Sequence, residues 1–352
     1  MFYPEPDADL VADVDTIDSV EWEAGLGTTW EHFAFNFDDP RLQNLYVRQA
    51  IAQAINREAI LEAVVRPIAS DVQLLGNSIW PNTSRNYEDH FNAVFPYAPA
   101  AAEALLVENG CVRSGDGVYE CDGQRLSFTW TTTGDEGREL QFALAQADLA
   151  AIGIEVTANF IPFSQLGASG FFFGPSDQWQ ILNFAWIGSH DPQGGNSLYY
   201  CEGEAPNGFG EINNLRYCNE QVDALIRSTN SIVDPVERAE VYNQADALWL
   251  AEVPLIPLYQ KPTFFAWNSV IEGPRDNPTQ VGPLWNIGDW TGKENVIFGV
   301  DQEPESLNVL EPDGSLFIAG LISSAILEGA YTVSPELEYV PQLVESAETI
   351  VP

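Results

Sequence analysis

The chain has 352 residues, of which 45% are hydrophobic, so it is long enough to form two domains and to bury a substantial core. It carries 52 Asp and Glu against 14 Lys and Arg, and the resulting net charge of -38 argues against nucleic acid or an anionic membrane as a partner. Solubility, for example in a salty medium, accounts for this acidity, and a preference for cationic ligands is the alternative.

The first third of the chain alternates strand and helix patterns. Residues 30–37 alternate large apolar and polar side chains, which predicts a strand. Residues 45–65 repeat apolar positions at three- and four-residue steps, with an interruption at Asn56 that indicates two abutting helices. A helix over 100–110 and, after a hairpin, a strand over 126–132 follow.

The middle of the chain continues the alternation. A helix over 137–151 leads into a strand over 153–161, and this order of strand, helix and strand predicts a parallel pair with a right-handed crossover. Next come a buried strand, two helices and a strand, at residues 179–186, 219–231, 234–253 and 253–268. The elements together predict an α/β fold with parallel strands and covered faces.

The four cysteines predict two local disulfides. Cys111 and Cys121 flank a segment whose centre, residues 115–117, has the sequence of a tight hairpin loop, and Cys201 and Cys218 bracket a loop rich in Gly, Pro and Asn. Four cysteines allow three connectivities, and pairing within each of these segments distorts the chain least. Buried free thiols are the alternative. A metal site is not expected, because there is no CxxC and the three His are scattered.

The N-terminus gives no targeting signal. Residues 1–15 are acidic where a signal peptide has a basic region and an apolar region, and no apolar run approaches the roughly 18 residues of a membrane span. We therefore expect neither a membrane span nor a signal peptide within the chain. The protein is then cytosolic or begins upstream of Met1, and the cysteines favour the second alternative, an extracytoplasmic protein.

Three segments resemble one protein family. Residues 33–60, 186–192 and 248–273 resemble, in order, blocks of the peptide, nickel and oligosaccharide solute-binding proteins of ATP-driven importers. The resemblance spans roughly residues 15–290. It implies an α/β fold of the periplasmic-binding-protein-like type II, with two lobes of which the first is incomplete here.

The last 60 residues resemble the opposite end of the same family. The sequence pattern breaks near residues 290–293, and the segment from 293 to 352 resembles the one with which mature members begin. We therefore interpret residues 1–290 as the C-terminal part of a solute-binding domain, with lobe II, the hinge and the return to lobe I. Residues 293–352 are interpreted as the N-terminal start of a second or permuted unit.

The resemblance implies a carrier that breaks no bond and needs no cofactor. Such a protein would be the extracytoplasmic substrate-binding component of an ABC transporter, which captures a peptide-like or other small oligomeric solute and delivers it to a membrane permease. Two α/β lobes would close on the ligand about hinge strands. The sequence does not identify the ligand.

Five residues are candidates for the ligand site. The resemblance places a contact to a ligand amine at Asp191 and an aromatic wall at Trp186, and a carboxylate beside an indole suits an ammonium group. For Asp191 the alternative is a turn residue, and for Trp186 it is core packing. Asn36 is expected in a hinge strand or as an ordinary strand residue. Trp80 and Tyr199 are candidates for ligand contact, with packing as the alternative.

Two other classes of function compete with the carrier. A secreted glycosidase would use two of the many carboxylates as acid and base, although no familiar catalytic motif frames such a pair. An extracellular adhesion or scaffold module would have no closed cleft and no ligand-dependent shift in melting temperature.

Overall fold

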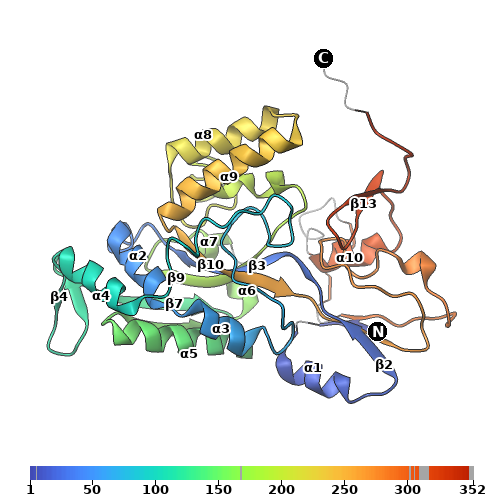
Figure 1. Ribbon diagram of the computed structural model, residues 1–352, viewed down its shortest axis with the longest axis horizontal. Helices are drawn as coiled ribbons and strands as arrows, with labels where there is room; N and C mark the ends of the chain where they lie inside the picture. The colour runs from blue at the N-terminus through green and yellow to red at the C-terminus, as the bar shows by residue number, and fades with distance from the viewer. Residues whose placement is uncertain (5, 167–168, 301–302, 305, 309–316, 349–352) are drawn as a thin grey trace.

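A computed structural model describes residues 1–4, 6–166, 169–300, 303–304, 306–308 and 317–348 (Figure 1). Its main sheet has five strands in the order β10-β3-β9-β7-β8. Their bounds in that order are Leu255–Pro262, Leu26–Phe35, Ile181–Ile187, Ser127–Thr132 and Glu155–Phe160. The mixed α/β fold confirms the predicted fold class.

Helices cover both faces of this sheet, with α8 and α9 above it and α3 and α5 below it in Figure 1. The predicted break at Asn56 is confirmed, because the Asn56 side chain accepts a hydrogen bond from the backbone N–H of Ala59 and starts a new helix. Asp234 caps α9 in the same way, as predicted. The bounds of α2 to α5, α8 and α9 are Leu45–Ala54, Arg57–Val64, Pro99–Glu108, Glu136–Ala151, Glu220–Ser228 and Pro235–Ala251. The shorter helices α1, α6, α7 and the 3-10 helices η2 and η3 span Ala8–Asp15, Phe163–Leu166, Ser169–Phe172, Thr229–Ser231 and Ile287–Asp289.

The strand directions correct part of the sequence interpretation. β7 pairs in parallel with β8, as predicted, and also with β9. However, β3 runs antiparallel to both of its neighbours, β9 and β10. The sheet is therefore mixed, with two parallel pairs on one side of β9 and two antiparallel pairs that involve β3.

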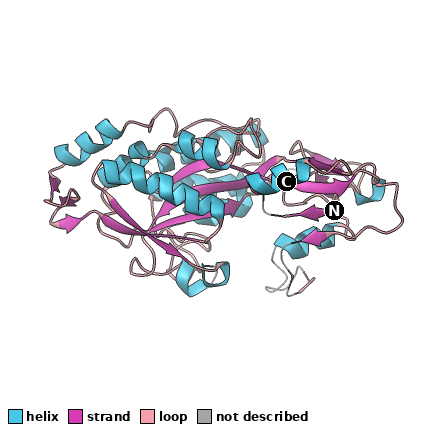
Figure 2. Cartoon of the chain, turned by 90° about the horizontal axis from the view of Figure 1, so that it is seen from below, coloured by secondary structure: helices cyan, strands magenta, loops and turns pink. Residues whose placement is uncertain are grey.

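The predicted strand over 253–268 is two strands in two sheets. β10 belongs to the main sheet, whereas β11 (Phe265–Asn268) belongs to a smaller sheet of order β12-β1-β11-β2, in which β1 spans Phe2–Tyr3 and β2 spans Val20–Glu23. Since β2 leads into β3, two neighbouring chain segments cross together from one sheet to the other. Figure 2 shows the larger part with most helices and the smaller part that carries the N-terminus.

Close packing fixes this crossing. The Thr263 hydroxyl accepts a hydrogen bond from the backbone N–H of Gly25 at 3.0 Å. A Cβ at Gly27 would lie 1.7 Å from the carbonyl oxygen of Pro278, so this approach of two backbones requires glycine. The two segments therefore cross between the sheets at residues 24–25 and 263–264.

Both predicted disulfides are confirmed. Cys111 is bonded to Cys121 and Cys201 to Cys218, and no cysteine is free. The first closes a hairpin in a three-stranded sheet of Val112–Arg113, Tyr119–Cys121 and Gln124–Arg125, which are β4 to β6.

The described part of residues 293–352 packs on the smaller part of the molecule. β12 (Gly299–Val300) pairs in parallel with β1, and two side chains of α10 (Phe317–Ser324), Ile318 and Leu321, share an apolar cluster with Leu284. A hairpin of Tyr331–Val333 and Tyr339–Pro341, β13 and β14, completes this segment. Residues 309–316, which belong to the motif that resembles a family start, lie outside the described residues, and the division at 290–293 stays a prediction.

The crossing predicts an unusual pH dependence. Asp276 is buried there, with its carboxylate against the Thr263 hydroxyl, and burial raises its pKa from 3.8 to about 7. The folded state therefore binds this proton more tightly than the unfolded chain does, so the stability contribution is full below pH 4 and is lost as the pH rises toward 7. Asp276→Asn should raise the free energy of unfolding at pH 8 by about 2 to 4 kcal/mol, with little change at pH 4.

Urea unfolding at both pH values measures this difference. Asp18→Asn removes the same charge from an exposed position and serves as the control. An Asp276→Asn variant with the same effect at pH 4 and pH 8 would contradict the assignment.

Candidate functional site

A cavity of about 320 Å³ lies at the carboxyl end of β9, a usual place for a ligand in an α/β sheet. Its floor comes from β3 and β9, and its walls come from the segment 75–81, the loop after β9, and the 3-10 helix η1 (Pro192–Tyr199). Tyr242 of α9 lies on one side. Gln280, which follows the return into the smaller part of the molecule, lies on another.

Three tryptophans form the apolar surface of this cavity. Trp30 of β3 and Trp186 of β9 are direct cross-strand partners, so the strand register places both indoles on the same face of the sheet. Trp80 stands across from them and meets the Tyr242 ring edge-on at 5.8 Å. The indole N–H groups of Trp80 and Trp186 are buried and have no hydrogen-bond partner among the described residues. The indole N–H groups of Trp130, Trp249 and Trp267, which do not line the cavity, are buried and unpaired in the same way, so this state is not specific to the site.

The cavity also has a polar wall around Ser78. The Ser78 hydroxyl lies 3.1 Å from the hydroxyl of Tyr199, and Asn77 and Asn196 add amide groups to the lining. Burial raises the pKa of Tyr199 well above 10, with Asp246 nearby adding to the effect. Tyr199 therefore stays protonated at physiological pH, and its hydroxyl can donate a hydrogen bond.

Within the described part of the chain, no charged side chain lines the cavity. His32 lies behind Trp186 with the two rings parallel and their centroids 6.3 Å apart, but burial lowers its pKa to about 3, so it is neutral. The site therefore suits neutral, polar and apolar groups, and its described lining holds no carboxylate pair of the kind that a glycosidase needs.

Asp191 borders the cavity between two lining residues, Ser189 and Pro192. One carboxylate oxygen accepts a hydrogen bond from the backbone of Gln193, which caps η1, and the other lies 2.9 Å from the guanidinium of Arg238. The side chain is 33% exposed. Both the predicted contact with a ligand amine and the alternative of a turn residue remain open at this position.

The other predicted residues fall into two groups. Trp80, Trp186 and Tyr199 line the cavity together. Asn36 lies beyond the far end of β3, where its amide donates to the carbonyl oxygens of Gly174 and Trp179. Its side chain is fully buried and satisfied within the protein, away from both the cavity and the crossing between the sheets.

Several lining residues are not predicted from the sequence. Trp30 lies in the predicted strand over 30–37, but both faces of that strand are covered, so its alternation does not show which face borders the cavity. Asn77 and Ser78 lie in an irregular segment that shows no periodicity, and Gln280 comes close only because the chain returns from the smaller sheet.

Metal and membrane features are both missing from the described residues. There, no three His, Cys, Asp or Glu side chains gather in the arrangement of a metal site. No helix in the described ranges is long and apolar enough to cross a bilayer.

Because the indole N–H of Trp186 is unpaired, Trp186→Phe should lower the free energy of unfolding only modestly. Trp179 offers a matched control, because it is fully buried and donates its indole N–H to the carbonyl oxygen of Phe172 at 3.2 Å. Both Trp→Phe changes remove similar volume, but only Trp179→Phe leaves a buried acceptor without its donor. Urea unfolding should show Trp186→Phe to cost about 1 kcal/mol less than Trp179→Phe, and equal costs would contradict the unpaired state of Trp186.

Comparison with known proteins gives consistent matches. Residues 1–209 match the family described as bacterial extracellular solute-binding proteins, family 5 Middle. Over 250 residues the chain is 30% identical to an oligopeptide-binding protein, OppA, of Mycobacterium tuberculosis, covering 70% of this chain and 40% of that protein. The disulfides and the family agree with an extracytoplasmic protein.

Two solved structures share the fold. The oligopeptide-binding protein AppA of Bacillus subtilis, in complex with a nonapeptide, superposes with a TM-score of 0.69 at 22% identity, covering 82% of this chain and 55% of that one. The periplasmic EDTA-binding protein EppA gives a TM-score of 0.72 at 19% identity, covering 83% and 54%. The chain thus spans about half the length of these relatives. By its match over more than half of its residues, it belongs to the family 5 extracellular solute-binding proteins.

Proposed function

We propose that this chain forms much of the binding cleft of an ABC importer's substrate-binding component and that its solute is a short peptide. The observation that carries the proposal is the cavity, whose described lining combines three indoles with hydroxyl and amide groups and has no charged side chain. Peptide carbonyl oxygens would accept hydrogen bonds from the hydroxyl and amide groups, while apolar side chains would contact the rings. The peptide named with AppA and the name of OppA support the same class.

We further propose that Asp191 receives the amino terminus of the peptide. Its carboxylate is partly exposed at the rim, next to residues that line the cavity. The ammonium group of the peptide would contact the same Asp191 carboxylate that Arg238 contacts. Hydrogen bonds to charged groups carry about 1.5 to 3 kcal/mol, so the contact would contribute measurably to affinity.

The domain arrangement is part of the proposal. Because the chain spans about half the length of its relatives, the remaining wall of the cleft would come from a region outside residues 1–352 or from a neighbouring unit. Residues 293–352 would be the start of such a unit, packed on the first one through β12 and α10. Delivery would be to a membrane permease on the outer face of the cytoplasmic membrane, and no bond in the solute would be broken.

A thermal melting screen tests the solute class. In a longer protein that includes the remaining part of the cleft, trialanine at a hundred times its dissociation constant should stabilise the folded state by about 2.7 kcal/mol, since it binds only the folded state. EDTA is the competing ligand, because EppA is named for it. A shift with EDTA and none with trialanine or longer alanine peptides would refute the peptide proposal.

Acetylated peptides test the role of Asp191. Asp191→Asn should weaken binding of trialanine by roughly tenfold or more, because it removes the charge that holds the ammonium group, while N-acetyltrialanine should bind the two proteins equally. Asn still caps a helical turn, so the fold should persist. Isothermal titration calorimetry measures both affinities. If Asp191→Asn changes both peptides by the same factor, Asp191 serves only the cap and Arg238.

A further inference from the structure

One buried carboxylate, outside the cavity lining, supports the polar wall of the cavity. Asp246 of α9 is fully buried, and one of its oxygens accepts the backbone N–H of Ser78 at 2.9 Å and also contacts the Ser78 hydroxyl. The same hydroxyl reaches Tyr199 in the cavity. Asp246 itself does not line the cavity, so it acts on the site only through these two residues.

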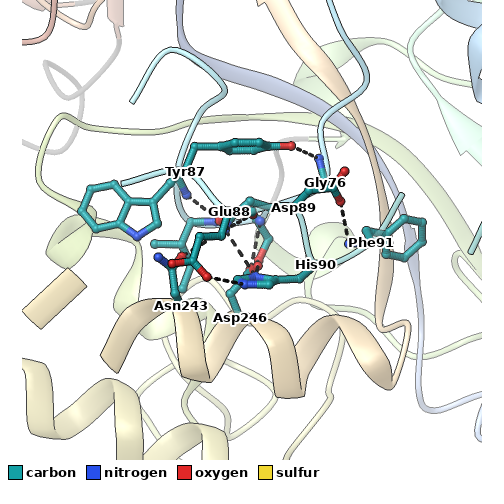
Figure 3. Close-up of polar contacts among 12 residues, drawn as sticks. Gly76, Tyr87, Glu88, Asp89, His90, Phe91, Asn243 and Asp246 are labelled. Atoms are coloured by element: carbon teal, nitrogen blue, oxygen red, sulfur yellow. Dashed lines mark hydrogen bonds and ion pairs between the residues drawn. The ribbon is translucent and has the colours of Figure 1, made fainter. Parts of the chain in front are cut away.

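The second oxygen of Asp246 faces His90. Its distance to the imidazole Nδ1 is 2.7 Å, while Nε2 on the far side of the ring lies 3.4 Å from Glu88 (Figure 3). Asp246 stands between the imidazole and the Ser78 hydroxyl, so the ring does not activate the serine as a nucleophile. The arrangement instead links a partly exposed histidine to the cavity wall through a single carboxylate.

The charge on Asp246 is balanced chiefly by His90. Burial raises the pKa of Asp246, and hydrogen bonds from His90 and Ser78 oppose this effect. For His90, burial lowers the pKa, but the contacts with Asp246 and Glu88 outweigh burial and raise it above 6.5. The imidazole is therefore charged in mildly acidic solution and neutral in basic solution.

Other titratable groups around the pair do not reverse this balance. Burial raises the pKa of Tyr87 and of Tyr199, and the Asp246 charge raises both further. Both side chains therefore stay neutral in the pH range where His90 titrates. Asp89 and Arg57 lie near Tyr87 and carry opposite charges. Asn77 and Asn243 add uncharged amides beside the ring.

We propose that Asp246 is a positioning residue for the ligand cavity, which fixes Ser78 and Tyr199, and that protonation of His90 strengthens this hold. The inference rests on the proposed function for its consequence, which is tighter solute binding in mild acid than in mild base. When the imidazole is charged, it orients and anchors the Asp246 carboxylate by a charge-assisted bond. When the imidazole is neutral, it holds the Asp246 carboxylate less firmly, and Ser78 and Tyr199 are less well fixed.

Hydrogen exchange of the Ser78 amide tests the positioning role without any ligand. After correction for intrinsic exchange, its protection by NMR should fall by about fivefold from pH 6 to pH 8.5, the ratio expected between a charge-assisted and a neutral hydrogen bond. In His90→Gln, an uncharged donor replaces the imidazole, and protection should become independent of pH. Asp246→Asn should reduce protection by at least about tenfold at pH 6.

Two variants control for unrelated effects. Asp234→Asn removes a charge from the same helix but keeps its cap, so Ser78 should be unaffected. Asp276→Asn removes another carboxyl whose pKa lies near 7, and the pH dependence of Ser78 should survive it. Persistence of the full pH dependence in His90→Gln, or unchanged protection in a folded Asp246→Asn protein, would overturn the inference.

Binding of N-acetyltrialanine amide tests the consequence, because this probe has no titratable group. Its affinity should be about fivefold higher at pH 6 than at pH 8.5 in the unmodified protein and equal at the two pH values in His90→Gln. An affinity independent of pH in the unmodified protein would overturn the link to the cavity. Absence of binding at any pH would refute the peptide proposal alone, since the Ser78 exchange still decides the positioning role.

Discussion

The antiparallel pairing of β3 with β9 is the constraint on which the site depends. It sets Trp30 directly opposite Trp186, and a slip of one residue between the strands would place the two indoles on opposite faces of the sheet. The same strand carries Glu31 on its opposite face, where the carboxylate is buried against Arg138 at 2.7 Å. The buried ion pair on one face of β3 and the aromatic floor on the other depend on the same strand register, so a shifted register would disrupt both.

Several buried titratable side chains lie close to the residues that line the cavity but are not part of its described lining. Asp246, His32 and Glu31 are all buried near the lining residues, yet each is neutral or balanced by a partner within the protein. The described cavity lining therefore presents hydrogen-bonding groups and rings without a fixed charge, while the Asp191 carboxylate lies beside it. Recognition in such a site depends on shape and on pairing every buried polar group, since each unpaired group costs free energy.

The second structural constraint is the crossing between the sheets. Two adjacent segments pass from the main sheet to the smaller one and are pinned by Thr263, Gly27 and the buried Asp276. Gln280 on the cavity wall follows this crossing in the chain. Burial raises the pKa of Asp276 to about 7, so the charge at the crossing changes near neutral pH.

Local sequence patterns determined the helices, their caps at Asn56 and Asp234, the hairpin with its disulfide, and the parallel pair of β7 and β8, because each depends on residues close together in the chain. Trp186 was also recognisable, since the family resemblance marked its segment, and Trp80 and Tyr199 were candidates by their aromatic character alone. Only the tertiary structure decided that β3 runs antiparallel between β9 and β10 and that residues 253–268 divide between two sheets. It also decided that the Asn36 amide donates its hydrogen bonds to backbone carbonyls. It also decided that Asp246 supports Ser78 from a helix 168 residues away in sequence, a pairing for which neither residue carries a local signal. The physical reason is that strand neighbours and buried polar partners are selected by which groups can be satisfied together in the folded core, and no short stretch of sequence contains that information.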